Sequence, residues 1–297
     1  MPAWAGLIPY FLFVGVGLIL PIAFLCWQAL RKTVVTGTHR DPVTQQFVQE
    51  SHTSFTLSNL HDSVQGINLT SLETSVRLSA ITAVIAAVVG VFLAQAVVSS
   101  KGSWLKSLVT TASAVTANFG GIPLAFLFIA TLDANAGVFT KFLQDHFDLS
   151  LQRDLGFQLS EMSGITLVYM YFLVPLMVLV IMPALEGIKA QWGEAAQNLG
   201  ATRLQYWRWV AGPVLLPSFL GSLLLLFCAA FSAYATASAL NSGFDLVTIR
   251  IASVLSGNVI AGQENLGAAL AVDMIALVLP LTAVYLLLQR RTSRWIS

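Results

Sequence analysis

One acidic residue lies inside a long apolar run, where an ionisable group is energetically costly. Asp273 falls in the first half of the run 265–289. An acid in such an environment favours a role in recognising or moving a polar or cationic solute. The alternative is that Asp273 lies close enough to the end of the run to be hydrated or hydrogen-bonded.

Two other apolar runs are interrupted by residues that could line a solute path. In the run 104–132, Asn118 and the pair Gly120-Gly121 precede Pro123, which predicts a loosened or broken helix. Close helix packing through small residues is the alternative. The end of the run 213–240 is rich in small and hydroxyl residues, including Ser232 and Tyr234. These side chains suit a surface that faces protein or a pore.

Residues typical of catalysis or cofactor binding do not assemble into a pattern. The sequence has no G-x-x-x-x-G-K-[ST] loop, no dinucleotide-binding glycine pattern and no H-E-x-x-H. The histidines lack metal-ligand spacing, so no metal site is expected; they are His39, His52, His61 and His146. We therefore expect no enzyme, no nucleotide or other cofactor on this chain and, with a net charge of +1, no nucleic-acid partner.

The composition is that of a membrane protein. Of 297 residues, 56% are hydrophobic and 10% are charged, whereas soluble domains have roughly 25% charged residues. Six runs are long enough to span a bilayer as helices. We expect them at 6–30, 72–98, 104–132, 164–185, 213–240 and 265–289. The first run lacks a preceding basic residue and is longer than the apolar region of a signal peptide, so a retained span is expected.

Lysine and arginine predict the orientation of these spans. Most basic residues near span ends fall on the side that holds both termini, and this side is expected to be cytoplasmic. They are Lys101, Lys106, Lys189, Arg203, Arg208, Arg290, Arg291 and Arg294. Arg31 and Lys32 oppose this assignment, but the other loops outweigh them. On the outer side, we expect a polar external loop with little core of its own at 31–71, an amphipathic surface helix at 136–149 and a connection at 241–264.

The segment 186–213 is an amphipathic insert between the fourth and fifth runs. Residues 186–199 favour a helix, and Gly200 is placed to end it in the left-handed conformation. Thr202 can cap a second helix at 203–210, which Pro213 is expected to stop. The second helix carries Tyr206, Trp207 and Trp209. These aromatic residues fit either a belt at the lipid headgroups or a surface that docks a cytoplasmic protein.

The same segment resembles a known signature. Glu194-Ala195-Ala196, then Gly200, Val210 and Pro213, is similar to E-A-A-x3-G-x9-I-x-L-P, with Val210 in place of Ile and Gly212 in place of Leu. This signature marks the permease subunits of bacterial binding-protein-dependent ABC importers. The resemblance covers residues 55–297, and 1–54 would contain the first transmembrane helix and the external loop.

The resemblance implies an all-α membrane protein with six transmembrane helices and a cytoplasmic helix–turn–helix coupling loop, the type I importer permease fold. The loop at 186–213 would be seated on a cytoplasmic ABC ATPase dimer, which would hold ATP and magnesium. Its coupling residues would be Glu194, Ala195, Ala196, Gly200, Arg203, Tyr206, Trp207 and Pro213. A second permease, identical or different, and an extracytoplasmic solute-binding protein would complete the complex in the bacterial plasma membrane.

The substrate is less closely defined by the resemblance. Segments such as NFGGIPLAFLFIATL and AAFSAYATASALNSG are similar to permeases grouped with spermidine and putrescine import. That group also includes permeases for ferric ion, thiamine and aminoethylphosphonate. The translocation path is expected to include Asn118, Gly120, Gly121, Ser232, Tyr234 and Asp273. A stand-alone secondary transporter is the alternative from a different class, and it would not require ATP.

Overall fold

The computed structural model describes residues 8–40, 47–100, 102–240, 243, 245–256 and 265–293. Five helical segments in this part of the chain are long and apolar enough to cross a membrane. They are Ile8–Ala29, Gly66–Ser99, Met162–Glu186, Arg203–Phe231 and Leu266–Leu287. A sixth span is present if the bent pair Ser103–Asn118 and Ile122–Leu132 is counted as one. The predicted helical membrane fold is therefore confirmed.

The structure divides into two compact units, of which the first contains residues 1–74 and 245–279. It includes α1 (Ile8–Val14), α2 (Leu20–Ala29), α3 (Ser58–Ser63) and α14 (Val247–Leu255), with the starts of α4 (Gly66–Ser99) and α15 (Leu266–Ser293). A π-helical turn, Gly15–Ile19, joins α1 to α2. Ala29 packs on Ala268 and Ala269, since these small side chains allow α2 and α15 to approach closely.

The polar loop expected after the first span contains a β-hairpin. β1 (Arg31–Arg40) pairs antiparallel with β2 (Phe47–Phe55), from Arg31 opposite Phe55 to Arg40 opposite Phe47, with an irregularity between Val35 and Gly37. The polar loop expected at 31–71 therefore contains a two-stranded sheet and α3, since inter-strand hydrogen bonds can satisfy this backbone without an apolar core. The connection at 241–264 likewise contains a helix, α14.

Side-chain amides hold the base of this hairpin. The Asn59 amide donates to the carbonyl oxygens of Ala29 at 3.0 Å and Arg31 at 2.7 Å. Asn265, just before α15, also donates to the Arg31 carbonyl, at 2.6 Å. The chain between α2 and β1 is thus fixed from two sides. In the same unit the Arg250 guanidinium donates to the Asn68 amide oxygen at 3.1 Å.

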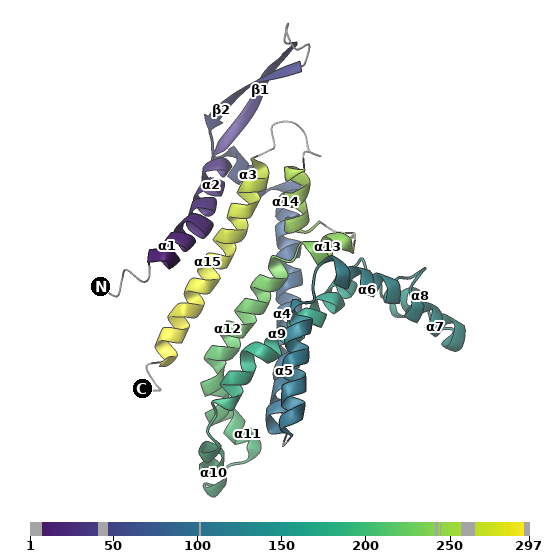
Figure 1. The fold of residues 1–297 in the computed structure, drawn as a ribbon, viewed down its shortest axis with the longest axis vertical. Coiled ribbons are helices and arrows are strands. Elements are labelled where there is room, and N and C mark those ends of the chain that lie inside the picture. Colours follow the sequence, from purple (N-terminus) through teal and green to yellow (C-terminus); the bar gives the residue numbers. More distant parts are fainter. Residues whose placement is uncertain are drawn as a thin grey trace. The chain divides into compact units, whose positions relative to one another are not determined.

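The second unit contains residues 75–244 and 280–297 and is organised around α9 (Met162–Glu186). α5 (Ser103–Asn118) and α12 (Gly212–Phe231) both pack against α9, as Figure 1 shows. α9 is apolar on all sides and buries residues along its length, which suits a central helix. α4 approaches it at Gly90, where an added Cβ would lie 2.6 Å from the Cβ of Met177.

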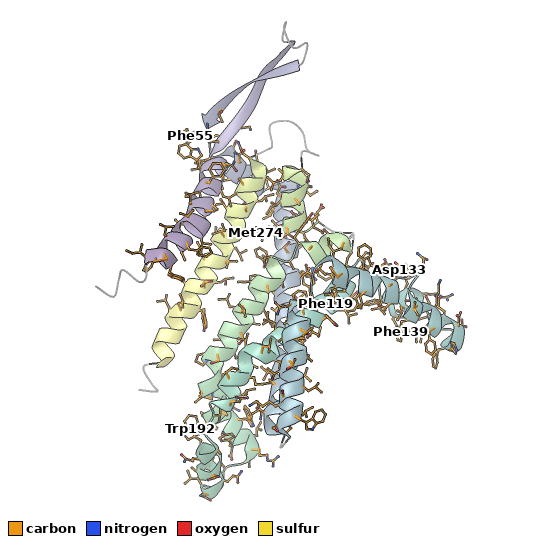
Figure 2. The ribbon with its side chains drawn as sticks, in the orientation of Figure 1. Phe55, Phe119, Asp133, Phe139, Trp192 and Met274 are labelled. Carbon is orange, nitrogen blue, oxygen red and sulfur yellow. The ribbon has the colours of Figure 1, made fainter. Side chains whose placement is uncertain are left out.

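The third predicted span is sharply bent. α5 ends at Asn118, and α6 (Ile122–Leu132) leaves at 99° to it. The chain continues into α7 (Val138–Phe147) and α8 (Leu151–Leu155), which extend away from α5 and α9 in Figure 1. Figure 2 places Phe119 at the bend and Phe139 on the projecting α7. The break expected at the two glycines is confirmed, and so is a helix within 136–149; its position on the outer face stays a prediction.

The fifth predicted span ends earlier than expected. α12 stops at Phe231, and a separate short helix, α13 (Ala235–Ala239), follows after a break at 232–234. Pro213 does not begin this span either. Arg203–Phe231 is one helical segment made of α11 (Arg203–Tyr206), a π-helical turn (Trp207–Ala211) and α12.

Candidate functional site: the 186–213 loop and two helix breaks

The loop after α9 forms a pair of short helices, but its first helix differs from the prediction. α9 continues to Glu186, Gly187–Lys189 are not helical, and α10 spans Ala190–Asn198. A single helix over 186–199 is therefore wrong. Lys189 has the extended backbone conformation typical of a residue that precedes a helix.

The turn after α10 is built as its residue types predict. Gly200 has φ of 76°, the left-handed conformation that glycine adopts without strain. Its amide donates to the Gln197 carbonyl at 2.9 Å, and the Ala201 amide donates to the Ala196 carbonyl at 2.9 Å. These two bonds form a complete Schellman motif, which satisfies carbonyl groups at the end of α10.

A capping box begins the next helix. The Gln205 amide donates to the Thr202 hydroxyl at 3.3 Å, and the Thr202 amide donates to the Gln205 side-chain oxygen at 2.7 Å. Both bonds satisfy donors that the first helical turn leaves without partners. The predicted cap at Thr202 is confirmed, and together with Gly200 it fixes the angle between α10 and α11.

Pro213 is accommodated by the π-helical turn instead of ending the helix. The Gly212 amide donates to the carbonyl of Trp207, five residues earlier. Proline has no amide hydrogen and usually clashes with the carbonyl four residues before it. The widened turn relieves this conflict, so the predicted stop at Pro213 is wrong. A Cβ at position 212 would lie 2.5 Å from the Trp207 carbonyl oxygen, which explains glycine at this departure from the signature.

The loop has two concave faces. One depression of about 580 Å³ includes Ala195, Ala196, Gly200 and Tyr206 among its lining residues. A second, of about 500 Å³, includes Arg203, Tyr206 and Trp207. Glu194 is exposed and lines neither, and Pro213 is exposed within α12. The predicted coupling residues therefore do not share one face, and Tyr206 is the member that borders both depressions.

Several exposed apolar residues of this loop are not singled out by the signature. Leu199, Leu204 and Trp209 have exposed fractions of 87%, 78% and 70%. The Arg208 guanidinium stacks over the Trp209 ring at 5.7 Å. Figure 2 places Trp192, which also lines the larger depression, on α10. The signal in the sequence is the occurrence of large apolar side chains in an otherwise polar insert, which is typical of a contact surface.

The two helix breaks of the second unit are bonded to each other. Gly121, with φ of 79° and ψ of −151°, donates its amide to the Thr236 hydroxyl at 2.9 Å. The Tyr169 hydroxyl, on α9, donates to the Ala233 carbonyl at 2.9 Å. Thr236 and Tyr169 are buried. Thr236 belongs to the hydroxyl-rich end of the run 213–240, whereas Tyr169 was not singled out by the sequence. They join segments more than 60 residues apart, a pairing for which the chain offers no local signal.

The other predicted path residues have separate surroundings. Asn118 and Ser232 each donate to a carbonyl of their own helix, at 2.8 Å and 2.9 Å, and Tyr234 is exposed. Gly120 has open space where a Cβ would be. Asp273 belongs to the first compact unit, beside Ser63, and one of its carboxylate oxygens is buried without a hydrogen-bond partner.

Among the residues that the structure describes, no group of three or more His, Cys, Asp or Glu side chains could hold a metal ion. The arrangement instead offers a loop with exposed apolar side chains and a helical core interrupted at two bonded breaks. Neither feature provides a nucleophile with an adjacent base.

Comparison with solved structures identifies the fold. The chain is similar to a bacterial ABC transporter involved in the import of the acidic polysaccharide alginate, with 15% identity, a TM-score of 0.65, and coverage of 97% of this chain and 94% of that chain. A structure of the bacterial alginate transporter in complex with an alginate pentasaccharide-bound periplasmic protein gives 14% identity, a TM-score of 0.64, and coverage of 97% and 93%. The inward-facing MetNI methionine ABC transporter gives 14% identity, a TM-score of 0.56, and coverage of 78% and 98%.

A comparison with curated proteins found no match. At the identities of the solved structures, the likeness concerns the fold alone. The family model described as "Binding-protein-dependent transport system inner membrane component" matches residues 86–294, from the middle of α4 to the end of the chain that the structure describes. The chain therefore belongs to this family of multi-pass inner-membrane proteins, the permease subunits of ABC importers, in which the ATPase is a separate subunit.

Proposed function

We propose that the 186–213 loop docks this permease onto a cytoplasmic ABC ATPase dimer and couples ATP hydrolysis to solute movement. The observation that carries the proposal is the exposed apolar surface of the loop, Leu199, Leu204 and Trp209. A Schellman turn and a capping box hold this surface in one geometry, which reduces the entropy lost on docking. Glu194 is exposed and available to a partner's polar groups.

The proposed assembly contains this permease, a second identical or different permease, two ATPases and an extracytoplasmic solute-binding protein. The family supports the binding-protein partner in general terms. ATP and magnesium would be bound by the ATPases, and this chain would need no cofactor. In this proposal the loop and both termini lie in the cytoplasm. The support is the basic residues Lys106, Lys189 and Arg203 near the corresponding ends of α5, α9 and the segment Arg203–Phe231.

The proposed substrate is a cationic polyamine, on a path that includes Asn118, Gly120, Gly121, Ser232, Tyr234 and Asp273. The support is the acidic Asp273, whose buried oxygen lacks a partner, and the resemblance of the surrounding segments to spermidine and putrescine permeases. Ferric ion, thiamine and aminoethylphosphonate are the competing substrates. ATP-dependent uptake of labelled spermidine, in competition with each of these, tests the assignment; uptake of one competitor without spermidine would contradict it.

Two tryptophans with the same exposed fraction allow a matched test of docking. Trp209 in the loop and Trp104 at the start of α5 are both 70% exposed. Trp209→Ala should lower affinity for the ATPase by about tenfold or more, since exposed tryptophan is a frequent interface hot spot. Trp104→Ala should leave co-purification of the ATPase unchanged.

A headgroup belt predicts a different outcome. If both tryptophans only contact lipid, the two variants should change membrane insertion alike and leave the ATPase bound. Equal ATPase recovery from both variants, at wild-type expression, would therefore contradict the docking proposal.

A further inference from the structure

A pocket of about 500 Å³ lies between the loop and the adjoining ends of two membrane-spanning helices. Its walls include Val98 in the last turn of α4 and Leu185 in the last turn of α9. Its other side is formed by α10 and α11. Because α4 and α9 are candidate spans, the pocket lies beside the ends of two such helices, where lipid headgroups are expected.

The polar lining of this pocket is basic. Lys189 and Arg203 both line it, from the residue before α10 and the first residue of α11, and no acidic residue is among its lining residues. Glu186 is close in sequence, but its carboxylate is paired with Lys106 at 2.5 Å. Two cations thus share one concavity without a carboxylate in its lining to neutralise them.

The remaining lining combines hydrogen-bonding and apolar groups. Gln95 donates to the Ser99 hydroxyl at 3.0 Å, and both line the pocket. Tyr206 and Trp207 add amphipathic rings, and Ile188 adds an aliphatic side chain. A ligand that has both a phosphate and apolar chains matches this lining. Lysine and arginine would bind its phosphate, and its apolar chains would lie against Val98, Leu185 and Ile188. A free phosphate would leave the apolar walls without a contact.

We propose that this pocket binds the phosphate group of an anionic phospholipid from the surrounding leaflet. The proposal rests on the proposed cytoplasmic placement of the loop, because basic pockets between spans on that side bind anionic headgroups. It goes beyond docking of the ATPase, since a lipid bound here contacts Lys189 and Arg203 together with the ends of α4 and α9. The bound lipid joins the loop to the membrane-embedded helices.

Native mass spectrometry of the purified full-length chain tests this binding with phosphatidylglycerol, phosphatidylcholine and inorganic phosphate as separate probes. The wild type should retain phosphatidylglycerol in preference to phosphatidylcholine. The double variant Lys189→Gln with Arg203→Gln should lose about fivefold in phosphatidylglycerol affinity for each charge removed. Arg208→Gln is the matched control, because Arg208 lies in the same loop but stacks on Trp209 and does not line the pocket.

A charge-conserving variant, Lys189→Arg with Arg203→Lys, keeps a cation at both positions and should retain the lipid. This control separates loss of charge from loss of folding. Equal retention of the two lipids, or an equal loss in Arg208→Gln, would overturn the proposal. Binding of inorganic phosphate with the same residue dependence and no retained phosphatidylglycerol would overturn the lipid assignment. Lipid retention is measured without the ATPase, so its failure is distinguishable from failure of docking through Trp209.

Discussion

The amide of Gly121 donates to the hydroxyl of Thr236 at 2.9 Å, across 115 residues of sequence. This bond joins the bend between α5 and α6 to the start of α13. The Gly121 carbonyl also accepts from the same hydroxyl, at 3.4 Å. One threonine therefore contacts both backbone groups of the glycine that precedes α6.

Thr236→Val should destabilise the protein by about 1–3 kcal/mol, because it leaves the Gly121 amide without its partner at nearly constant volume. Thermal unfolding in detergent, followed by tryptophan fluorescence, measures the loss. Thr131→Val is the control, since the Thr131 hydroxyl donates to carbonyls of its own helix, at 2.9 Å and 3.2 Å. An equal shift in both variants would contradict a specific role for Thr236.

Gly121→Ala should be poorly tolerated, while Gly120→Ala should be nearly neutral. Gly121 has backbone angles that are essentially restricted to glycine, and an alanine there should cost about 1–3 kcal/mol. Gly120 has no positive φ, and no atom lies within 4 Å of the position that an alanine methyl group would occupy. Hydrogen exchange of the 118–124 amides should rise in Gly121→Ala alone. Protection unchanged in both variants would show that the bend does not depend on glycine.

Tyr169→Phe should destabilise the protein by about 1–2 kcal/mol through loss of the bond to the Ala233 carbonyl in a buried environment. Tyr171→Phe, on the same helix, is the control; its ring stacks edge-on against Phe128 and should keep that contact. Unfolding by titrated denaturing detergent compares the two. A larger loss of stability in Tyr171→Phe would contradict a stabilising role for the hydrogen bond between Tyr169 and the Ala233 carbonyl.

Gly212→Ala should disturb the π-helical turn, because the new Cβ would lie 2.5 Å from the Trp207 carbonyl oxygen. Overpacking of this kind costs about 1–3 kcal/mol, so the melting temperature should fall. Gly187→Ala is the control, since its Cβ would be 3.4 Å from the Pro183 carbonyl, an ordinary contact. ATP-driven uptake should fall with the stability of Gly212→Ala. A stable, fully active Gly212→Ala would show that the turn can revert to a regular helix.

Local residue chemistry predicted the turn of the loop correctly. Gly200 and Thr202 act through their own backbone and side-chain preferences, which operate over a few residues and can be read without knowledge of the fold. The two glycines before Pro123 predicted a break for the same reason. The 99° direction of that break depends on packing of α6 against α13, which the chain does not encode locally.

The incorrect predictions arose where the backbone adopts a less common alternative to the arrangement that the residue types favour. Pro213 normally stops a helix, but a widened turn that begins at Trp207 allows the helix to continue. The hairpin at 31–55 was missed although Thr33-Val34-Val35-Thr36 contains the β-branched residues typical of strands. The roles of Thr236 and Tyr169 could not be predicted, because a buried hydroxyl has many candidate acceptors until the helices are assembled.

The helix from Arg203 to Phe231 has 29 residues, so it forms a rod about 43 Å long. One end belongs to the loop and the other meets the break held by Tyr169. A displacement of α11 would therefore reach the Ala233 junction along one helical segment. Pro213 lies within this segment, and the π-helical turn keeps the helix continuous there.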